Sequence, residues 1–281
     1  MSPLAAVVIA AHNEEAVITR CLDALTGAAR PGELEVVVVA NGCTDRTAWL
    51  ARAAGARVLE TPLPGKAAAL VLGDRECTAF PRAYLDADVE LSTESLRILC
   101  RALDSAGLLA CSPSPRHELA GVSGTAARFH RVTDRLLGGR RGLTGAGVYV
   151  LSEAGHRRVF PLPPVLADDG YVHRSFRAGE RAQVAAAGSV VRPARRIGAV
   201  IRRRARVRLG NAELDRLGLP PGGPALRPSD LATLLRRGET TPCDALVFLG
   251  VLAAERMLAL WRNWRGAASI WSPDRTARTA E

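Results

Sequence analysis

The sequence has few lysines, few aromatic residues and no long apolar run. Of its 38 basic residues only Lys66 is a lysine, so arginine supplies nearly all of the positive charge. The Arg-rich residues 192–208 have little aromatic interleaving, which argues against stacking on single-stranded nucleic acid. No uncharged apolar segment approaches the roughly 20 residues of a membrane-spanning helix. The best candidate, Ala245 to Ala254, has about half that length.

Several other signals are missing. The six cysteines are scattered without a C-x-x-C pair, so neither a zinc site nor a disulfide framework is indicated, and a reduced, cytoplasmic setting fits best. The amino terminus lacks a basic region, and Asn13–Glu15 interrupts its apolar run, so no signal peptide is expected. No G-x-G-x-x-G follows the first apolar run, and Pro64–Ala67 lacks the remaining residues of a P-loop. These absences argue against dinucleotide-binding and P-loop folds.

The net charge of +10 comes mainly from one segment. Between Arg181 and Ala212 there are nine arginines and no acidic residue, so the remainder of the chain carries only +1. A basic segment on a nearly neutral protein needs its own explanation, either an anionic ligand or a solvated helix face.

Apolar runs and helical patterns alternate along the first part of the chain. Runs that are apolar throughout are typical of strands buried on both faces, and patterns with a single apolar stripe indicate helices. Strands are expected at Leu4–Ala11, Leu34–Ala40, Ala56–Glu60 and Pro81–Leu85, and helices at Glu14–Leu25, from an N-cap at Thr44 to Ala54, and at Gly65–Ala79. This order predicts an α/β fold with a mainly parallel sheet, helices on both faces and a ligand crevice at the carboxyl ends of the strands.

Polar residues follow these strands where that crevice is expected. His12 and Asn13 follow the first strand, Asn41 the second, and the D-x-D pair Asp86 and Asp88 the fourth. Two carboxylates are hard oxygen ligands that suit Mg²⁺ or Mn²⁺ against a diphosphate. A D-x-D tripeptide is equally compatible with a surface turn. The presence of a single lysine, Lys66, is also compatible with chance. The convergence of polar residues at one edge favours a nucleotide site.

The ordered motifs resemble a known family. Val7–Glu15, Val39–Asp45, Gly65–Lys66, Tyr84–Asp88 and Ala167–Gly170 look like the motifs of family 2 inverting glycosyltransferases with the GT-A fold, over about residues 4–210. The resemblance implies a nucleotide-sugar donor, Mg²⁺ or Mn²⁺ on Asp86 and Asp88, and direct attack by the hydroxyl of an acceptor, which the sequence does not identify. Without the processive Gln-x-x-Arg-Trp motif, transfer of a single sugar is expected.

The resemblance also implies roles for individual residues. Asp169 matches the general base, and Asp168 is its neighbour or the N-cap of the next helix. Apart from the resemblance, Gly145 and Gly147 would let a substrate, here the acceptor, approach the backbone, and a tight turn is the alternative. Asn41 stands where the family usually has an Asp that reads uracil, and His12 where an aromatic residue stacks on the base. The residues expected to bind the donor are His12, Asn13, Glu14, Asn41, Lys66, Asp86, Arg204 and Arg208.

The carboxyl-terminal region differs in character. We place a transferase domain at residues 1–212, and a linker with a helical extension at 213–281. Residues 272–281 are expected to be frayed. In the extension an apolar stripe recurs at helical spacing, at Leu246, Leu249, Ala253, Met257, Leu260 and Trp264. Packing of this stripe on the catalytic domain is favoured, and contact with the inner face of a membrane, helped by Trp261 and Trp271, is the alternative.

Two other functions remain open at this point. A sugar-phosphate nucleotidyltransferase shares the sheet and the metal chemistry, but would want a Gly-rich basic loop where His12–Glu15 stands. A non-catalytic protein could use the arginines to bind anions or nucleic acid, although no specific nucleic-acid signal is present.

Overall fold

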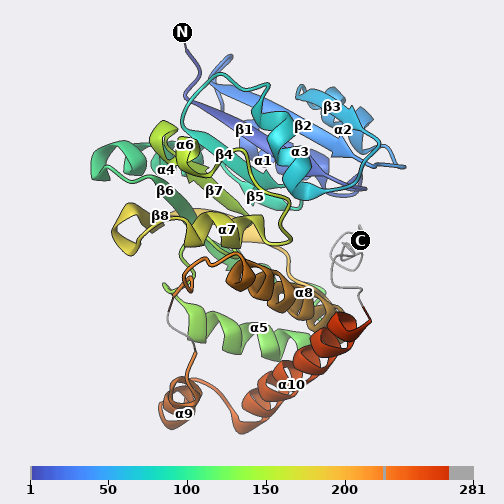
Figure 1. Ribbon diagram of the computed structural model, residues 1–281, viewed down its shortest axis with the longest axis vertical. Coiled ribbons are helices and arrows are strands. Elements are labelled where there is room, and N and C mark those ends of the chain that lie inside the picture. Colours follow the sequence, from blue (N-terminus) through green and yellow to red (C-terminus); the bar gives the residue numbers. More distant parts are fainter. Residues whose placement is uncertain (1, 224–225, 266–281) are drawn as a thin grey trace.

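The computed structural model describes residues 2–223 and 226–265, and Figure 1 shows their arrangement. The strands are β1 (Ala5–Ala11), β2 (Leu34–Asn41), β3 (Arg57–Thr61), β4 (Arg82–Asp86), β5 (Val89–Leu91), β6 (Ala110–His117), β7 (Val148–Leu151) and β8 (Arg181–Val191). The helices are α1 (Ile18–Thr26), α2 (Thr47–Ala53), α3 (Lys66–Asp74), α4 (Thr93–Ala106), α5 (Gly124–Leu137), α6 (Glu153–Val159), α7 (Asp168–Arg174), α8 (Ile197–Arg216), α9 (Pro228–Arg236) and α10 (Pro242–Trp264), with a 3₁₀ turn η1 at Ala178–Glu180.

The strands form one eight-stranded sheet in the order β3-β2-β1-β4-β7-β6-β8-β5. The first four strands are parallel, as predicted, so the carboxyl ends of β1, β2 and β4 lie at one edge. The rest of the sheet is mixed. β7 is antiparallel to both β4 and β6, and β5 is antiparallel to β8, while β6 and β8 are parallel. The α/β prediction is confirmed, with this mixed half as a refinement.

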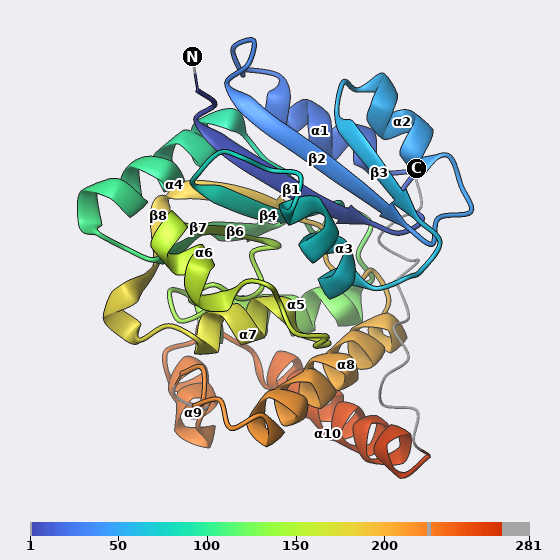
Figure 2. The same ribbon diagram turned by 45° about the horizontal axis from the view of Figure 1, so that its top comes forward.

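Alternate residues of β1 supply two separate cores. Val7 and Ile9 pack with α1 and α4 on one face, and Val8 packs with α3 on the other. Figure 2 shows these helices on opposite sides of the sheet. α3 comes close to the sheet at Gly73, where an added Cβ would lie 2.6 Å from Val8 Cγ1. A larger side chain would push away the helix that begins at Lys66.

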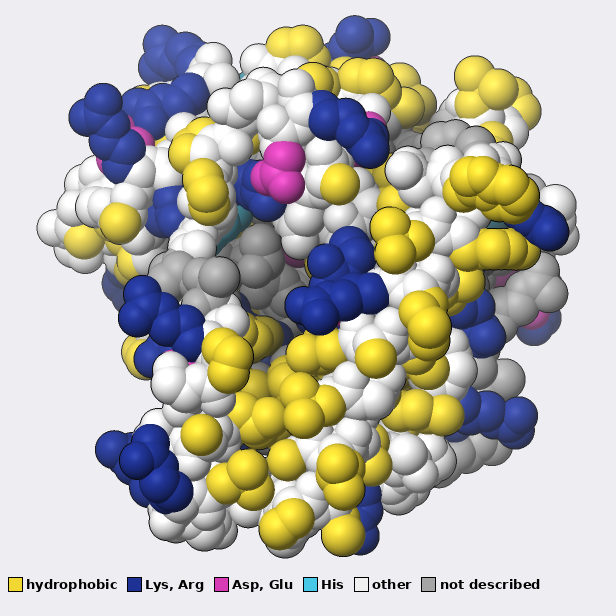
Figure 3. All heavy atoms as spheres, turned by 60° about the horizontal axis from the view of Figure 1, so that its bottom comes forward, with side chains coloured by type: hydrophobic (Ala, Val, Ile, Leu, Met, Phe, Trp, Pro, Cys, Tyr) yellow, Lys and Arg dark blue, Asp and Glu magenta, His cyan; other side chains and the backbone are white. Residues whose placement is uncertain are grey.

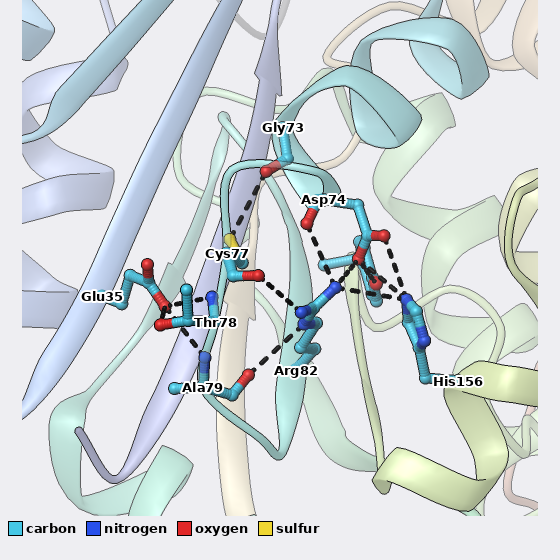
Figure 4. A network of polar contacts seen from close by, with 9 residues as sticks. Glu35, Gly73, Asp74, Cys77, Thr78, Ala79, Arg82 and His156 are labelled. Carbon is cyan, nitrogen blue, oxygen red and sulfur yellow. Dashed lines mark hydrogen bonds and ion pairs between the residues drawn. The ribbon is translucent and has the colours of Figure 1, made fainter. Parts of the chain in front are cut away.

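A buried polar network fixes the start of β4 (Figure 4). The carboxylate of Asp74, at the end of α3, accepts hydrogen bonds from Arg82 (2.6 Å) and Tyr84 (2.6 Å), and it also contacts His156 Nε2 (2.9 Å). Burial raises the pKa of Asp74, but the hydrogen bonds from His156, Tyr84 and Arg82 outweigh it, so the pKa is lowered. The network joins α3, β4 and α6 at the edge of the sheet opposite the polar strand ends.

Some predicted boundaries are wrong. α1 begins at Ile18, because residues 14–17 form turns, and α2 begins at Thr47 with Arg46 in the N-cap position. Thr44 instead donates its backbone N–H to Asn13 Oδ1 at 2.8 Å. We also expected Asp168 and Asp169 to lie at a strand-to-helix step, but α7 follows a loop, with no strand directly before it.

The carboxyl-terminal helices form a third layer with α5 (Figure 1). Phe129 of α5, Val200 of α8, Leu234 of α9 and Phe248 of α10 belong to one apolar cluster. The domain boundary expected at residue 212 therefore falls within α8, which joins both parts. No helix in the described part of the chain is long and apolar enough to cross a membrane.

α10 packs on this layer with a different face from the one that the sequence predicted. The buried residues are Asp244, Ala245, Phe248, Val251, Glu255 and Ala259. The apolar stripe expected to pack on the catalytic domain points to solvent, with Leu246 69% and Leu260 70% exposed. That prediction is wrong, because the helix has apolar residues on both sides. Trp271 and the frayed end expected at 272–281 lie outside the described residues.

The buried carboxylate of α10 should matter for stability. Glu255 is 1% exposed and binds Arg204 (2.7 Å) and Arg208 (2.8 Å). We expect Glu255→Gln to lower the free energy of unfolding by about 2 kcal/mol, because hydrogen bonds to charged groups contribute roughly 1.5–3 kcal/mol. Chemical denaturation measures the loss. The exposed Glu239→Gln is the control and should change stability by less than about 0.5 kcal/mol. Equal effects of the two variants would contradict the assignment.

Candidate active site

A cleft opens at the carboxyl ends of β1, β2 and β4. The turn after β4 lies at one wall, and the chain from the end of β8 into α8 supplies basic side chains to another. The cleft is lined by Ala10, His12, Glu14, Asn41, Lys66, Asp86, Ala87, Asp88, Val89, Gly147, Val191, Arg192, Arg203 and Arg206. Six predicted donor- or metal-binding residues thus meet in one place, which follows from the parallel register of the strands.

The segment after β1 is held by the loop after β2. His12 Nδ1 lies 2.6 Å from the carbonyl oxygen of Asn41. Because a carbonyl oxygen only accepts, Nδ1 donates this hydrogen bond. Asn13 has a positive φ of 54° and accepts from Thr44 N, and Glu14 is buried. His12 and Glu14 reach the cleft, whereas Asn13 shapes the turn beside it.

Asn41 connects the cleft to the turn before α3. Its side chain is 3% exposed, and its Nδ2 donates to the carbonyl oxygen of Ala11 at 2.8 Å. Its Oδ1 accepts from the backbone N–H of Gly65 at 3.0 Å. Both ends of the amide are therefore engaged with backbone, so Asn41 positions Gly65 and the lysine that follows.

Lys66 lines the cleft and joins the D-x-D motif there to the acidic pair Asp168–Asp169, whose side chains are not among the residues that line the cleft. Its Nζ lies 2.6 Å from Asp86 Oδ1 and 2.9 Å from Asp168 Oδ1. Asp86 ends β4 and Asp168 begins α7, so one ammonium group connects two segments that are 82 residues apart. Asp168 does not cap α7, because the N-cap position is Ala167 and no side-chain cap is formed. The alternative role expected for Asp168, helix capping, is wrong.

Lys66 is charged, and its positive charge stabilises the ionised form of the buried Asp168 beside it. Burial lowers the pKa of Lys66, but Asp168, Asp86 and Asp169 outweigh it, so the pKa is raised. Burial raises the pKa of Asp168, and the attraction of Lys66 opposes this rise. The second oxygen of Asp168 is buried and accepts no hydrogen bond within the described part of the chain. Without the charge of Lys66, the buried negative charge of Asp168 would have no positive charge to offset its desolvation.

Asp169 lies in a different environment from its neighbour. It is half-buried, and its Oδ2 accepts from the backbone N–H of Gly145 at 3.4 Å. Gly145 and Gly147 both have positive φ, of 76° and 68°. An added Cβ on Gly147 would lie 2.3 Å from Val89 Cγ2. Glycine is needed at position 147 both for the backbone conformation and for the close approach of Val89, the first residue of β5.

The structure divides the arginines of α8 between two faces. Arg204 and Arg208 were expected at the donor, but they bind Glu255 of α10 and do not line the cleft. Arg203 and Arg206 line it instead, with Arg192 from the end of β8. The sequence contains a feature that indicates some arginines of α8 bind an internal acid and do not reach the donor. Glu255 is an acid in the middle of an apolar helix and required cations from a neighbour.

The carboxylates in the cleft fit a divalent metal ion. Asp86 and Asp88 both line the cleft, and the side chain of Asp86 is 35% exposed. No group of three or more His, Cys, Asp or Glu side chains that could hold a metal occurs among residues 2–223 and 226–265. Two carboxylates with room for phosphate oxygens and water are the arrangement that Mg²⁺ uses at nucleotide sites. A metal ion would therefore bind together with a nucleotide.

A protein-family comparison identifies the chain. Residues 6–158, more than half of the sequence, match the model of glycosyl transferase family 2. The chain belongs to this family. It is therefore a glycosyltransferase that uses a nucleotide-sugar donor, as the ordered motifs predicted. A comparison with curated protein sequences found no match.

Solved structures show the same GT-A fold. One is a mannosyltransferase from Pyrobaculum calidifontis in complex with GDP-Man and Mn²⁺. It is 22% identical, covers 96% of this chain and 86% of its own, and has a TM-score of 0.64. Another is glucosyl-3-phosphoglycerate synthase from Mycobacterium tuberculosis in complex with Mg²⁺ and UDP. It is 24% identical, covers 77% and 80% of the two chains, and has a TM-score of 0.56. At these identities the likeness establishes the fold.

The amide of Asn41 gives a test of the cleft geometry. We expect Asn41→Asp to lower the free energy of unfolding by about 1–3 kcal/mol, because a buried carboxylate would then face the Ala11 carbonyl without a donor. Urea denaturation at neutral pH measures this loss. Asp and Asn have nearly the same shape, so the exposed Asn263→Asp serves as the control. If Asn41→Asp leaves stability unchanged, Nδ2 does not make the bond to Ala11.

Proposed function

We propose that the protein is a metal-dependent, inverting glycosyltransferase that moves one sugar from a nucleotide-sugar donor to the hydroxyl group of an acceptor. The observation that carries this proposal is that Lys66, which lines the cleft, forms ion pairs with both Asp86 and Asp168. It joins the strand end that would hold metal and diphosphate to the helix that carries the proposed base. Membership of the family favours this activity over nucleotidyl transfer and over non-catalytic anion binding.

The donor would lie along the carboxyl ends of β1, β2 and β4. His12 and Asn41 line the part of the cleft formed by the first two strands. We place the base there, with His12 beside it. Arg192, Arg203, Arg206 and Lys66 line the cleft with Asp86 and Asp88, and we assign these four cations to the diphosphate. Their charge would favour departure of the nucleoside diphosphate, because negative charge grows on it as the bond to the sugar breaks.

Mg²⁺ or Mn²⁺ would be held by Asp86 and Asp88 and would supply further charge stabilisation at the diphosphate. Solved relatives of the same fold contain Mn²⁺ or Mg²⁺ together with a nucleotide or nucleotide sugar. This chain itself contributes the carboxylates of Asp86 and Asp88, which both line the cleft.

Asp169 is the proposed general base, and Asp168 its positioning neighbour. Inversion requires a carboxylate that takes the acceptor proton on the side opposite the leaving group. Asp168 is buried against Lys66, whereas Asp169 is half-buried and is held by Gly145. The acceptor would enter beside Gly145 and Gly147, where the backbone comes close to the cleft.

The first experiment concerns the metal. A thermal-shift screen of UDP, GDP and dTDP sugars with Mn²⁺ identifies the base, because a ligand that binds the native state raises its melting temperature. We then expect Asp88→Ala to weaken Mn²⁺-dependent binding of that nucleoside diphosphate by about tenfold or more in calorimetry, a loss of about 1.4 kcal/mol or more. Binding in EDTA should change little. The exposed Asp23→Ala is the matched control, and a full Mn²⁺ response in Asp88→Ala would contradict the assignment.

The second experiment tests which residue accepts the proton of the acceptor hydroxyl group. We expect Asp169→Asn to keep its affinity for the donor and to lose about 10²–10⁴ in transfer rate, because general-base catalysis contributes about that much. Asp168→Asn should instead weaken donor binding, because it loosens Lys66. Donor hydrolysis serves as the assay until the acceptor is known, and the exposed Asp104→Asn should behave as wild type. If Asp169→Asn is active and Asp168→Asn is inactive, Asp168 is the general base and Asp169 the positioning residue.

A further inference from the structure

Helix α10 presents an extended apolar face to solvent. Leu246, Met257, Leu260 and Trp264 are 69%, 66%, 70% and 83% exposed. They recur at helical spacing with Leu249 and Ala253 between them, so they lie on one side of the helix. At a rise of 1.5 Å per residue, the face from Leu246 to Trp264 is about 27 Å long. Scattered surface hydrophobic residues are ordinary in proteins, but a continuous face of this length marks an interaction surface.

The exposed charges that α10 and its C-cap contribute beside this apolar face have one sign. The two acids of α10 point inward, where Asp244 binds Arg128 and Glu255 binds Arg204 and Arg208. The exposed charged residues of α10 and its C-cap are Arg256 and Arg265. Figure 3 shows apolar side chains gathered over the end of the molecule formed by the carboxyl-terminal helices, with basic side chains around them.

The carboxyl-terminal end of the face combines aromatic and basic side chains. The guanidinium of Arg265 lies 4.3 Å from the ring centre of Trp261. Trp264, three residues further along the helix, is the most exposed large apolar residue among those described. Trp and Arg both have an apolar body and a polar end, so they suit a boundary between hydrocarbon and water.

We propose that this apolar face of α10 binds the surface of a membrane that contains anionic phospholipid, with the helix lying in the plane of the interface. Charge complementarity selects this partner. If a second copy of the chain covered the face, Arg256 and Arg265 of each copy would approach arginines, with no exposed acid of α10 to meet them. An anionic lipid surface accepts the apolar side chains and binds the arginines at the same time.

Binding in this orientation would place the cleft one helix away from the membrane. α8 packs on α10 through Ala205 and Leu209, and other residues of the same helix, Arg203 and Arg206, line the cleft. The surface is separate from the residues assigned to donor and proton transfer. Its test therefore does not depend on the proposed enzymatic activity.

Flotation of the full chain with vesicles tests the proposal. The probes are vesicles of phosphatidylcholine alone and of phosphatidylcholine with phosphatidylglycerol. We expect binding to the anionic vesicles, weaker binding in high salt, and a loss of about tenfold or more in affinity for Leu260→Glu, because a charge in the apolar region opposes insertion. Leu63→Glu is the matched control, because Leu63 is 74% exposed and lies outside the helical layer. Circular dichroism and thermal melting confirm that both variants fold.

Several results would overturn the proposal. One is failure of the wild-type chain to float with anionic vesicles. Another is equal binding by Leu260→Glu and the wild type, because the contact would then lie elsewhere. A dimer seen by light scattering in the wild type, absent in Leu260→Glu and unaffected by vesicles, would assign the face to a second copy of the chain. Loss of the anionic preference in Arg256→Glu would support the charge argument.

Discussion

The cleft depends on the ion pairs of a single ammonium group. Lys66 joins Asp86, at the end of a central strand, to Asp168, at the start of a helix that is distant in the sequence. Without it, two carboxylates would face each other in a partly buried site, and their repulsion would have to be relieved by protonation or by movement. An ammonium on a flexible stem can contact both acids as a point charge, whereas a planar guanidinium would impose its own geometry. This gives a physical reason for a lysine in a chain that otherwise uses arginine.

The second constraint is the double role of α8. One set of its arginines lines the cleft and another set neutralises the buried Glu255. The same helix approaches α7 closely at Gly210, where an added Cβ would lie 2.9 Å from the Cβ of Ala167. The acidic pair of α7 and the basic wall of the cleft are therefore set by one helix. α10 in turn fixes α8 through ion pairs and apolar contacts.

The sequence predicted the half of the structure in which local patterns and the register of the sheet agree. Mostly apolar segments identified β1, β2 and β4, and parallel pairing then brought His12, Asn41 and Asp86 together. The antiparallel partner of β8, the strand β5, could not be predicted in the same way, because a strand of three residues carries little periodic signal. The outward stripe of α10 was assigned to the wrong environment because that helix is apolar on two sides. Its inward face is marked by smaller residues and by the paired acids Asp244 and Glu255.

Consecutive acids in a sequence do not have equivalent chemistry in the fold. Asp168 and Asp169 begin the same helix, so their side chains leave the axis about 100° apart. One direction leads to Lys66 and burial, and the other to the backbone N–H of Gly145 and partial exposure. The first carboxylate is committed to an internal cation and the second is not. The start of a helix, positioned by the close packing of α7 on α8, is therefore enough to separate a structural acid from one that can accept a proton.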